Sequence, residues 1–181
     1  MKRILLLLLT MVALSFQAVA DDYQSTINTF RQAPETQPFF SNAYAYAVFP
    51  TIGKGGIGIG GAYGEGKVYR GGSVTGSVNM AQLTLGFQLG GQAFSQIVFL
   101  QDKRAYNEFT SGSFEFGAQA SAVAITAGAS AQAGSTGTGA AAGKSQAKAN
   151  YVSGYAVFTV AKGGLMYEAS IGGQKFSFKP N

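Results

Sequence analysis

Apolar and polar residues alternate along several short segments of this chain, which is the pattern of strands with one buried face. In residues 82–89 every second residue is Leu or Phe, which predicts a half-buried strand whose polar face meets water. The apolar run at residues 97–100 is continuous and predicts a strand covered on both sides. Alternation returns at residues 165–171, and Phe176 and Phe178 share one face of a final strand.

Two glycine-punctuated segments share one layout. The sequence Tyr-Ala-Val-Phe occupies residues 46–49 and again residues 155–158, and a Lys-Gly-Gly triplet follows each copy, starting at Lys54 and at Lys162. Lys67 lies 13 positions after Lys54, and Lys175 lies 13 positions after Lys162. Because glycine readily adopts the positive φ angles of tight turns, the repeat predicts two related hairpins, each with a strand, a turn and a return strand.

Two short helices complete the predicted fold. Tyr23, Ile27 and Phe30 recur at helical spacing in residues 22–31, and this helix is expected to cap one end of the sheet. Asp102 is expected to cap a second helix that runs through Phe109. We therefore predict a mainly β (α+β) fold with a single antiparallel sheet, strongly curved or closed into a barrel, two short helices and a long Ala/Gly-rich loop.

Two segments outside the strand pattern indicate a signal peptide and a mobile loop. Met1, Lys2 and Arg3 precede an apolar run, and Ala18 and Ala20 form a small-x-small cleavage site, which is typical of a secretory signal peptide over residues 1–20. The mature chain is then expected in the periplasm, the envelope or the medium. It divides into a helical lead-in at 21–41 and a β-rich domain at 42–178. Residues 131–148 hold no large apolar residue and are expected to form a mobile loop.

Composition argues against catalysis and against nucleic-acid binding. The chain has no histidine and no cysteine, so the usual general base, the thiol nucleophile and the commonest zinc ligands are absent from the sequence. The eight acidic residues show no paired-carboxylate or calcium-loop spacing. We expect no enzyme activity, no metal and no cofactor. Loss of Lys2 and Arg3 with the signal peptide lowers the formal net charge from +5 to +3, which is milder than in most nucleic-acid binders.

The glycine pattern resembles the SYLF domain family, in its exported bacterial form, over residues 42–178. The motifs that carry the resemblance are Ala-Val-Phe-Pro at 47–50, Lys-Gly-Gly at 54–56, Gly-Gly at 60–61, Gly-Glu-Gly at 64–66, Gly-Phe-Gln-Leu-Gly-Gly-Gln at 86–92, Ile-Val-Phe-Leu at 97–100, and Lys-Gly-Gly at 162–164 with Ser170 and Gly173. The resemblance implies lipid binding. Eukaryotic members have a basic leading helix and a Gly-Arg pair, whereas this chain has only Arg31 in the lead-in and Gly128-Ala129, so phosphoinositide specificity does not carry over.

The hypothesis for function is a non-catalytic lipid-binding protein of the bacterial envelope. Binding to anionic phospholipid requires an apolar surface with basic side chains at its rim. The candidates for that rim are Lys54, Lys67, Arg70, Lys162 and Lys175, at turns that the repeat is expected to bring to one end of the sheet. Two alternatives are a self-assembling structural envelope protein and a small outer-membrane β-barrel. Each of these lysines is also consistent with an ordinary solvated turn.

Overall fold

A computed structural model describes residues 22–86, 92–118, 120, 122–125, 150–162 and 171–181. The helices are residues 22–32, α2 (Gln37–Asn42) and α3 (Lys103–Phe109). The strands are β1 (Ala45–Arg70), β2 (Ser73–Gly86), β3 (Gln92–Leu100), β4 (Phe114–Glu115), β5 (Val123–Ile125), β6 (Tyr155–Lys162) and β7 (Lys175–Pro180). The predicted signal peptide and the predicted mobile loop at 131–148 lie outside the described residues.

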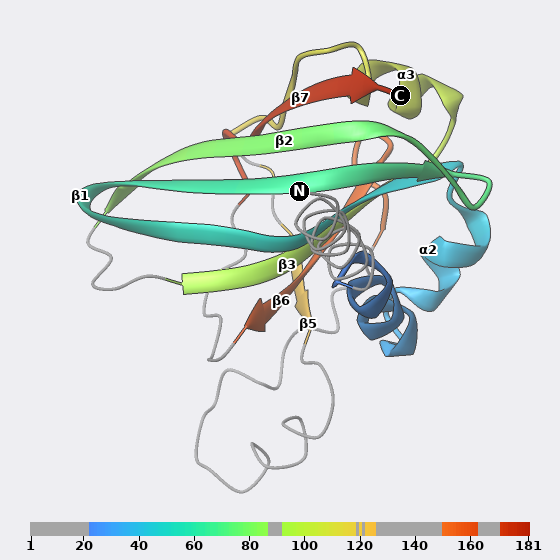
Figure 1. The fold of residues 1–181 in the computed structure, drawn as a ribbon, viewed down its shortest axis with the longest axis horizontal. Helices are drawn as coiled ribbons and strands as arrows, with labels where there is room; N and C mark the ends of the chain where they lie inside the picture. Colours follow the sequence, from blue (N-terminus) through green and yellow to red (C-terminus); the bar gives the residue numbers. More distant parts are fainter. Residues whose placement is uncertain (1–21, 87–91, 119, 121, 126–149, 163–170) are drawn as a thin grey trace, which may run out of the picture.

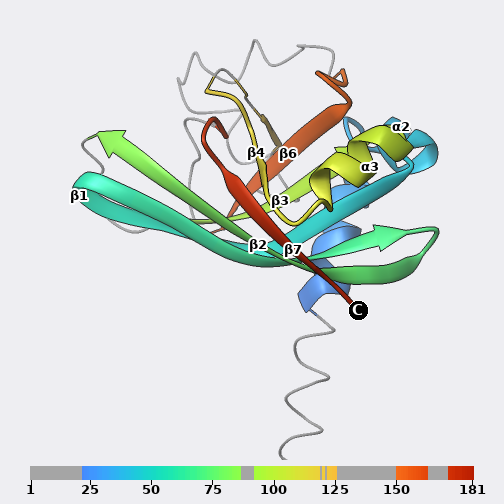
Figure 2. The same cartoon turned by 90° about the horizontal axis from the view of Figure 1, so that it is seen from above.

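The strands form one curled sheet in the order β4-β7-β2-β1-β3-β6-β5, and Figures 1 and 2 show its curvature. All neighbours are antiparallel except β5 and β6, which run parallel. The prediction of a mainly β fold with a curved antiparallel sheet is confirmed. The helix α2 is a third short helix, and all of it except Asn42 falls within the predicted helical lead-in at 21–41.

The strand β1 folds back on itself, as Figure 1 shows. Its first half pairs with β3 up to Lys54, and its second half pairs with β2 from Gly58 onward. The halves lie side by side, because a Cβ atom built on Gly64 would stand 3.0 Å from the carbonyl oxygen of Thr51. Gly56, in the reversal, has a φ of 146°. The first predicted hairpin therefore exists, and its two arms need glycine for their close approach.

The second predicted hairpin lies only partly within the described residues. Its first strand is β6, and Lys175 begins the separate final strand β7, which pairs with β2 and β4. The strand β6 pairs instead with β3 and β5, toward the other end of the sheet order. The two Tyr-Ala-Val-Phe strands both flank β3, and the strands that carry Lys67 and Lys175 both flank β2. The predicted return strand at 165–171 lies outside the described residues except for Ile171.

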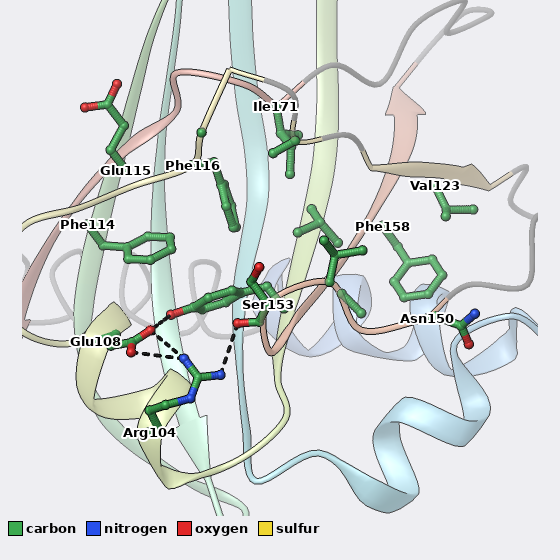
Figure 3. A pocket seen from close by; sticks show the side chains of 16 residues that line it. Arg104, Glu108, Phe114, Glu115, Phe116, Val123, Asn150, Ser153, Phe158 and Ile171 are labelled. Atoms are coloured by element: carbon green, nitrogen blue, oxygen red, sulfur yellow. Dashed lines mark hydrogen bonds and ion pairs between the residues drawn. The ribbon is translucent and has the colours of Figure 1, made fainter.

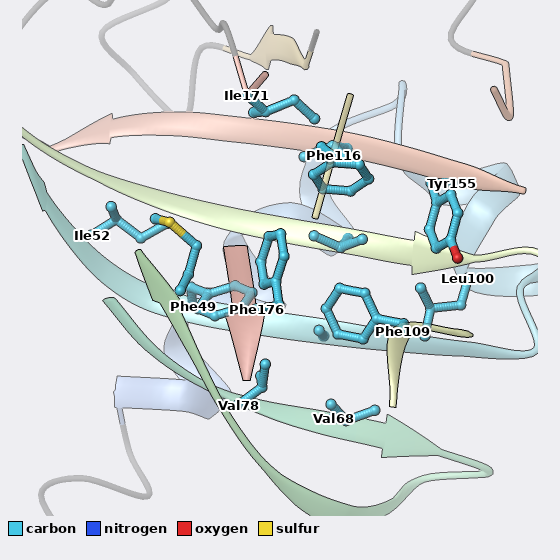
Figure 4. Close-up of a cluster of buried hydrophobic side chains, with 14 of the residues drawn as sticks. Phe49, Ile52, Val68, Val78, Leu100, Phe109, Phe116, Tyr155, Ile171 and Phe176 are labelled. Carbon is cyan, nitrogen blue, oxygen red and sulfur yellow. The ribbon is translucent and has the colours of Figure 1, made fainter. Parts of the chain in front are cut away.

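Each face of the sheet carries its own hydrophobic core. On the inner face, Phe49, Ile52 and Phe176 pack with Phe109 of α3, as Figure 4 shows. On the outer face, Tyr23, Ile27 and Phe30 of the first helix and Phe39 of α2 cover side chains of β1, β3 and β6. The buried strand residues in that second core are Val48, Ile97, Phe99, Ile125, Ala156, Phe158 and Val160. The first helix therefore covers part of a face, and does not cap an end of the sheet as predicted.

The elements follow their sequence signals closely in β3 and α3. Residues 97–100 are all fully buried, with alternate side chains in the two cores, which confirms a strand covered on both sides. The side chain of Asp102 accepts a hydrogen bond of 2.8 Å from the backbone N–H of Ala105, as expected for the residue that caps a helix. Phe176 and Phe178 both face the inner core.

The prediction for the start of the alternating segment at 82–89 is wrong. Gln82 is buried with 7% of its surface exposed, whereas Leu83 is 84% exposed. Gln82 donates a 2.9 Å hydrogen bond from Nε2 to the carbonyl oxygen of Gly172 on the inner side. A second buried polar contact joins Gln96 and Gln174, whose side-chain amides donate to each other. The inner core of this sheet therefore contains paired amides, and the leucine that alternates with Gln82 points to water.

Candidate lipid-binding surface

The helices cover only part of the outer face of the sheet. They lie over β1, β3 and β6, while the outward residues of β2 and β7 are exposed to solvent. We call this area the open face, and define it by the outward-pointing residues of the second half of β1, β2 and β7: Tyr63, Glu65, Lys67, Ser77, Asn79, Ala81, Leu83, Lys175, Ser177 and Lys179. Lys67 is half-buried at its border with the first helix, and the other nine residues are exposed.

Two large apolar side chains lie on the open face. Leu83 is 84% exposed and Tyr63 is 52% exposed, and they stand on neighbouring strands, since Tyr63 pairs with Ala81 and Gly61 pairs with Leu83. The hydroxyl group of Tyr63 donates a hydrogen bond of 3.2 Å to the carboxylate of Glu65. Single exposed apolar residues are common on protein surfaces. Here, however, the two residues occur beside a group of lysines.

Three lysines come together on the open face. Lys67, Ser77 and Lys179 occupy opposite positions on three adjacent strands, so the two lysines lie roughly 10 Å apart, at two strand spacings. Lys175 points the same way four residues along β7, roughly 13 Å from Lys179. Lys175 has a partner, because its Nζ atom lies 3.6 Å from Oε2 of Glu115. The ammonium group of Lys67 lies 4.5 Å from the ring centre of Tyr23.

Lys162 lies on the same outer face at another place. It ends β6, where it alternates with the outward-facing Val160, and its Nζ atom donates a 2.7 Å hydrogen bond to the hydroxyl oxygen of Thr51. It belongs to the β1-β3-β6 part of the sheet and not to the open face. Its exposed position nevertheless adds positive charge to the same side of the molecule.

The remaining two candidates, Lys54 and Arg70, point to the inner side. Lys54 is on the same face as Ile52, whose side chain belongs to the inner core. The guanidinium of Arg70 lies 5.3 Å from the ring centre of Tyr106 in α3 and 6.0 Å from that of Tyr44. The structure therefore does not gather all five predicted residues. It brings Lys67 and Lys175 to one face, with Lys162 at another part of that face.

Sequence reasoning did not identify Lys179 or the role of the face as a whole. The signal was present, because Phe176 and Phe178 were assigned to one face of the last strand, which places Lys175 and Lys179 together on the other. The missing information was strand order. Only the pairing of β7 with β2, and of β2 with β1, brings Lys179 next to Lys67.

A polar network at one end of α3 is a separate feature, which sequence reasoning also missed. Nη1 of Arg104 donates to both carboxylate oxygens of Glu108, at 3.0 and 2.9 Å, and Nη2 donates to the carbonyl oxygen of Ser153 at 3.1 Å. The hydroxyl group of Tyr155 donates to Glu108 at 3.0 Å. The hydrogen bonds from Arg104 and then Tyr155 hold the pKa of Glu108 below its ordinary value. Burial, and then the contact with Glu108, raises the pKa of Tyr155.

Two further properties of the described residues bear on the site. No three His, Cys, Asp or Glu side chains among them gather closely enough to hold a metal ion. Among the described helices, none combines the length and the apolar character needed to cross a bilayer.

The chain is similar to known proteins in two comparisons. Residues 81–181, more than half of the chain, match the family model described as Ysc84, Las17-binding protein actin regulator. The chain is also 26% identical over 153 residues to the protein called beta cell expansion factor A from Aeromonas veronii, a match that covers 83% of this chain and 51% of that protein. It thus spans about half the length of this relative. On the strength of the family match, this chain belongs to the Ysc84 (SYLF) domain family.

Proposed function

We propose that this protein is a non-catalytic lipid-binding protein of the bacterial envelope, and that its open face docks on anionic lipid. The observation that carries the proposal is Leu83, a large apolar side chain 84% exposed on a face that also holds Lys67, Lys175 and Lys179. Family membership supports a lipid partner in general, because SYLF domains are associated with lipid binding. The matched region includes Leu83, Lys175 and Lys179.

The physics of peripheral binding fits this arrangement. Apolar side chains enter the boundary between head groups and acyl chains, and each lysine near an anionic surface contributes about 1 kcal/mol. Glu65 and Glu115 oppose part of that attraction. The small side chains between the lysines, such as Ser77, Ala81 and Ser177, let the bilayer surface approach the sheet closely.

A charge-matched pair of variants tests the role of the open face. Lys175→Gln with Lys179→Gln removes two positive charges from it, and Lys54→Gln with Lys103→Gln removes two from elsewhere. We expect the first double variant to bind anionic vesicles up to about 2 kcal/mol more weakly in co-sedimentation, from about 1 kcal/mol per lysine. The second double variant should bind nearly as well as the unaltered protein. Added salt should weaken binding of the unaltered protein by screening the same attraction.

Equal loss in the two double variants would show that only net charge matters and would remove the open face from the proposal. Fibres that form in proportion to protein concentration, without vesicle binding, would instead favour the self-assembling structural role. Since no histidine or cysteine is present in the chain, the proposal assigns no catalytic step to any residue.

The proposed location is the periplasm or envelope, reached through cleavage of the signal peptide before Asp21. It is supported by the positive start, the apolar run and the small residues Ala18 and Ala20. Mass spectrometry of the protein recovered from an exporting cell should give an N-terminus at Asp21. Retention of Met1 on the recovered protein would rule out this processing.

A further inference from the structure

A cavity of about 510 Å³ lies between α3, β4, β5 and β6, and its lining residues come from both hydrophobic cores of the sheet. Its apolar wall includes Phe114, Phe116, Val123, Val157, Phe158 and Ile171. Figure 3 shows aromatic side chains on two sides of this space and the Arg104–Glu108 pair at its end. Small-molecule sites in proteins usually occupy roughly 300–1,000 Å³ and have mostly apolar walls with a few polar groups. This cavity has both properties.

The wall of the cavity favours an apolar occupant. Phe116, Phe158 and Ile171 expose 6%, 0% and 2% of their surface, so the wall is built from core residues. Water in a cavity needs two to four polar partners, which these three side chains do not provide. The polar lining residues are Arg104, Glu108, Glu115, Asn150, Ser153 and Tyr155. A hydrocarbon chain in the same space would replace unfavourable hydration with van der Waals contact.

The mouth of the cavity holds a cation, Arg104, between the carboxylates of Glu108 and Asp102. The guanidinium of Arg104 has five N–H groups; its three hydrogen bonds within the described residues go to Glu108 and to the backbone of Ser153, and its Nη2 atom lies 4.0 Å from Oδ2 of Asp102. The Arg104 side chain is 54% exposed, so its remaining donors are accessible from solvent. Val152, which also lines the cavity, is 74% exposed and adds an apolar lip beside Ser153.

We propose that this cavity binds one acyl chain of an anionic amphiphile, with the head group held at Arg104. The proposal deepens the lipid-binding function proposed above, on which it rests, and assigns a second contact with lipid at a different site. A free fatty acid and the chain of a membrane phospholipid share this chemistry. The open face then contacts the bilayer surface, and the cavity takes a single chain.

Displacement of a fluorescent fatty acid from the purified protein tests the cavity. A Cβ atom built on Gly117, which lines the cavity, meets no atom within 4 Å, so Gly117→Trp places an indole in open space without a backbone clash. We expect Gly117→Trp to lower the affinity for palmitate by about tenfold or more, equivalent to about 1.4 kcal/mol. Asn107→Trp, at an exposed position of α3 that does not line the cavity, is the matched control and should bind palmitate normally.

A second variant keeps the test decisive if Gly117→Trp fails to fold. Val152→Asp changes a side chain that is already 74% exposed, and it puts a carboxylate at the mouth, which should repel the anionic head group. Palmitate binding that survives in both folded variants, or palmitate that never displaces the probe from the unaltered protein, would overturn the proposal.

The head-group assignment has its own test. Arg104→Gln should weaken palmitate binding several-fold and leave binding of lysophosphatidylcholine, whose head group carries no net charge, nearly unchanged. The variant should remain folded, because exposed ion pairs such as Arg104–Glu108 contribute only about 0–1 kcal/mol. Equal palmitate affinity in the variant and the unaltered protein would remove Arg104 from the site.

Two comparisons distinguish a membrane phospholipid from a free fatty acid as the source of the acyl chain, and distinguish the cavity from the open face as the lipid contact. Displacement of the probe by phospholipid vesicles would assign a membrane lipid as the source, and displacement by palmitate alone would assign a free fatty acid. Lys179→Gln, which keeps the Lys175–Glu115 ion pair beside the cavity, should weaken vesicle docking without changing palmitate affinity. Vesicle docking with no palmitate binding would refute only the cavity, and palmitate binding without vesicle docking would refute only the open face.

Discussion

Replacement of Leu83 by Asn should separate membrane insertion from folding. Leu83 already exposes 84% of its surface in the folded protein, so the change removes almost no buried contact. The free energy of unfolding should therefore stay within about 0.5 kcal/mol of the original value, as for most surface substitutions. On a bilayer, the same side chain would lose its contact with water. Full burial of a leucine stabilises by about 1.5–3 kcal/mol.

Since most of that surface remains to be buried, we expect Leu83→Asn to weaken vesicle binding by about 2 kcal/mol, or about 30-fold. The assay is co-sedimentation with vesicles of increasing anionic lipid content, with thermal unfolding measured in parallel. Leu83→Trp is the control at the same position, because an indole is also apolar and prefers the bilayer interface. That variant should bind at least as well as the unaltered protein.

The leucine and lysine contributions should respond differently to conditions. The loss caused by Leu83→Asn should persist with neutral vesicles and in high salt, because apolar burial does not depend on charge. The loss caused by the open-face lysine variant should disappear under both conditions. Vesicle binding by Leu83→Asn that matches the unaltered protein in every condition would refute the assignment of this face to lipid.

Two further predictions concern the fold. Gly64→Ala should destabilise the protein by about 1–3 kcal/mol in denaturant unfolding, because the new Cβ would lie 2.6 Å from Cγ1 of Ile52, whereas Gly53→Ala meets no atom within 4 Å and should not destabilise it. Stability should also fall as pH rises from about 10 to 12. Burial raises the pKa of Tyr23 from 10.0 to about 12. The contribution of this hydroxyl group to the free energy of unfolding is therefore complete below its unfolded-state pKa, and it is lost as pH rises through its folded-state pKa. Tyr23→Phe should reduce this loss, and an unchanged alkaline profile in that variant would contradict the assignment.

Much of the fold was predictable because local signals and tertiary contacts agree. The continuous apolar run at 97–100 can be satisfied only by cover on both faces, and the structure supplies the inner core on one side and helices on the other. Asp102 begins α3 through a contact three residues away, which involves no distant element. In both cases the physical cause lies within a few residues, so the sequence pattern is sufficient.

The exposed leucine was not predictable in the same way. Alternation in residues 82–89 defines two faces, but it does not say which face meets the core. Gln82 is buried because the carbonyl oxygen of Gly172, 90 residues away, accepts its amide hydrogen. Leu83 is exposed because the helices that cover the outer face lie over β1, β3 and β6 and leave β2 open. Both causes depend on elements far apart in the chain.

The reversal within β1 explains why the predicted lysines separate. It sends the two arms of one long strand to different neighbours, the first to β3 and the second to β2. Lys54 precedes the reversal and shares the inner face with Ile52, while Lys67 follows it and points outward toward Tyr23. Spacing along the chain therefore placed the predicted lysines together because they follow similar turns, whereas in the folded sheet the side chains that lie together are those on the same face. Lipid contact depends on the face, because only side chains on one side of the sheet can touch a bilayer at the same time. For this reason Lys179, which no repeat predicted, is a stronger candidate than Lys54.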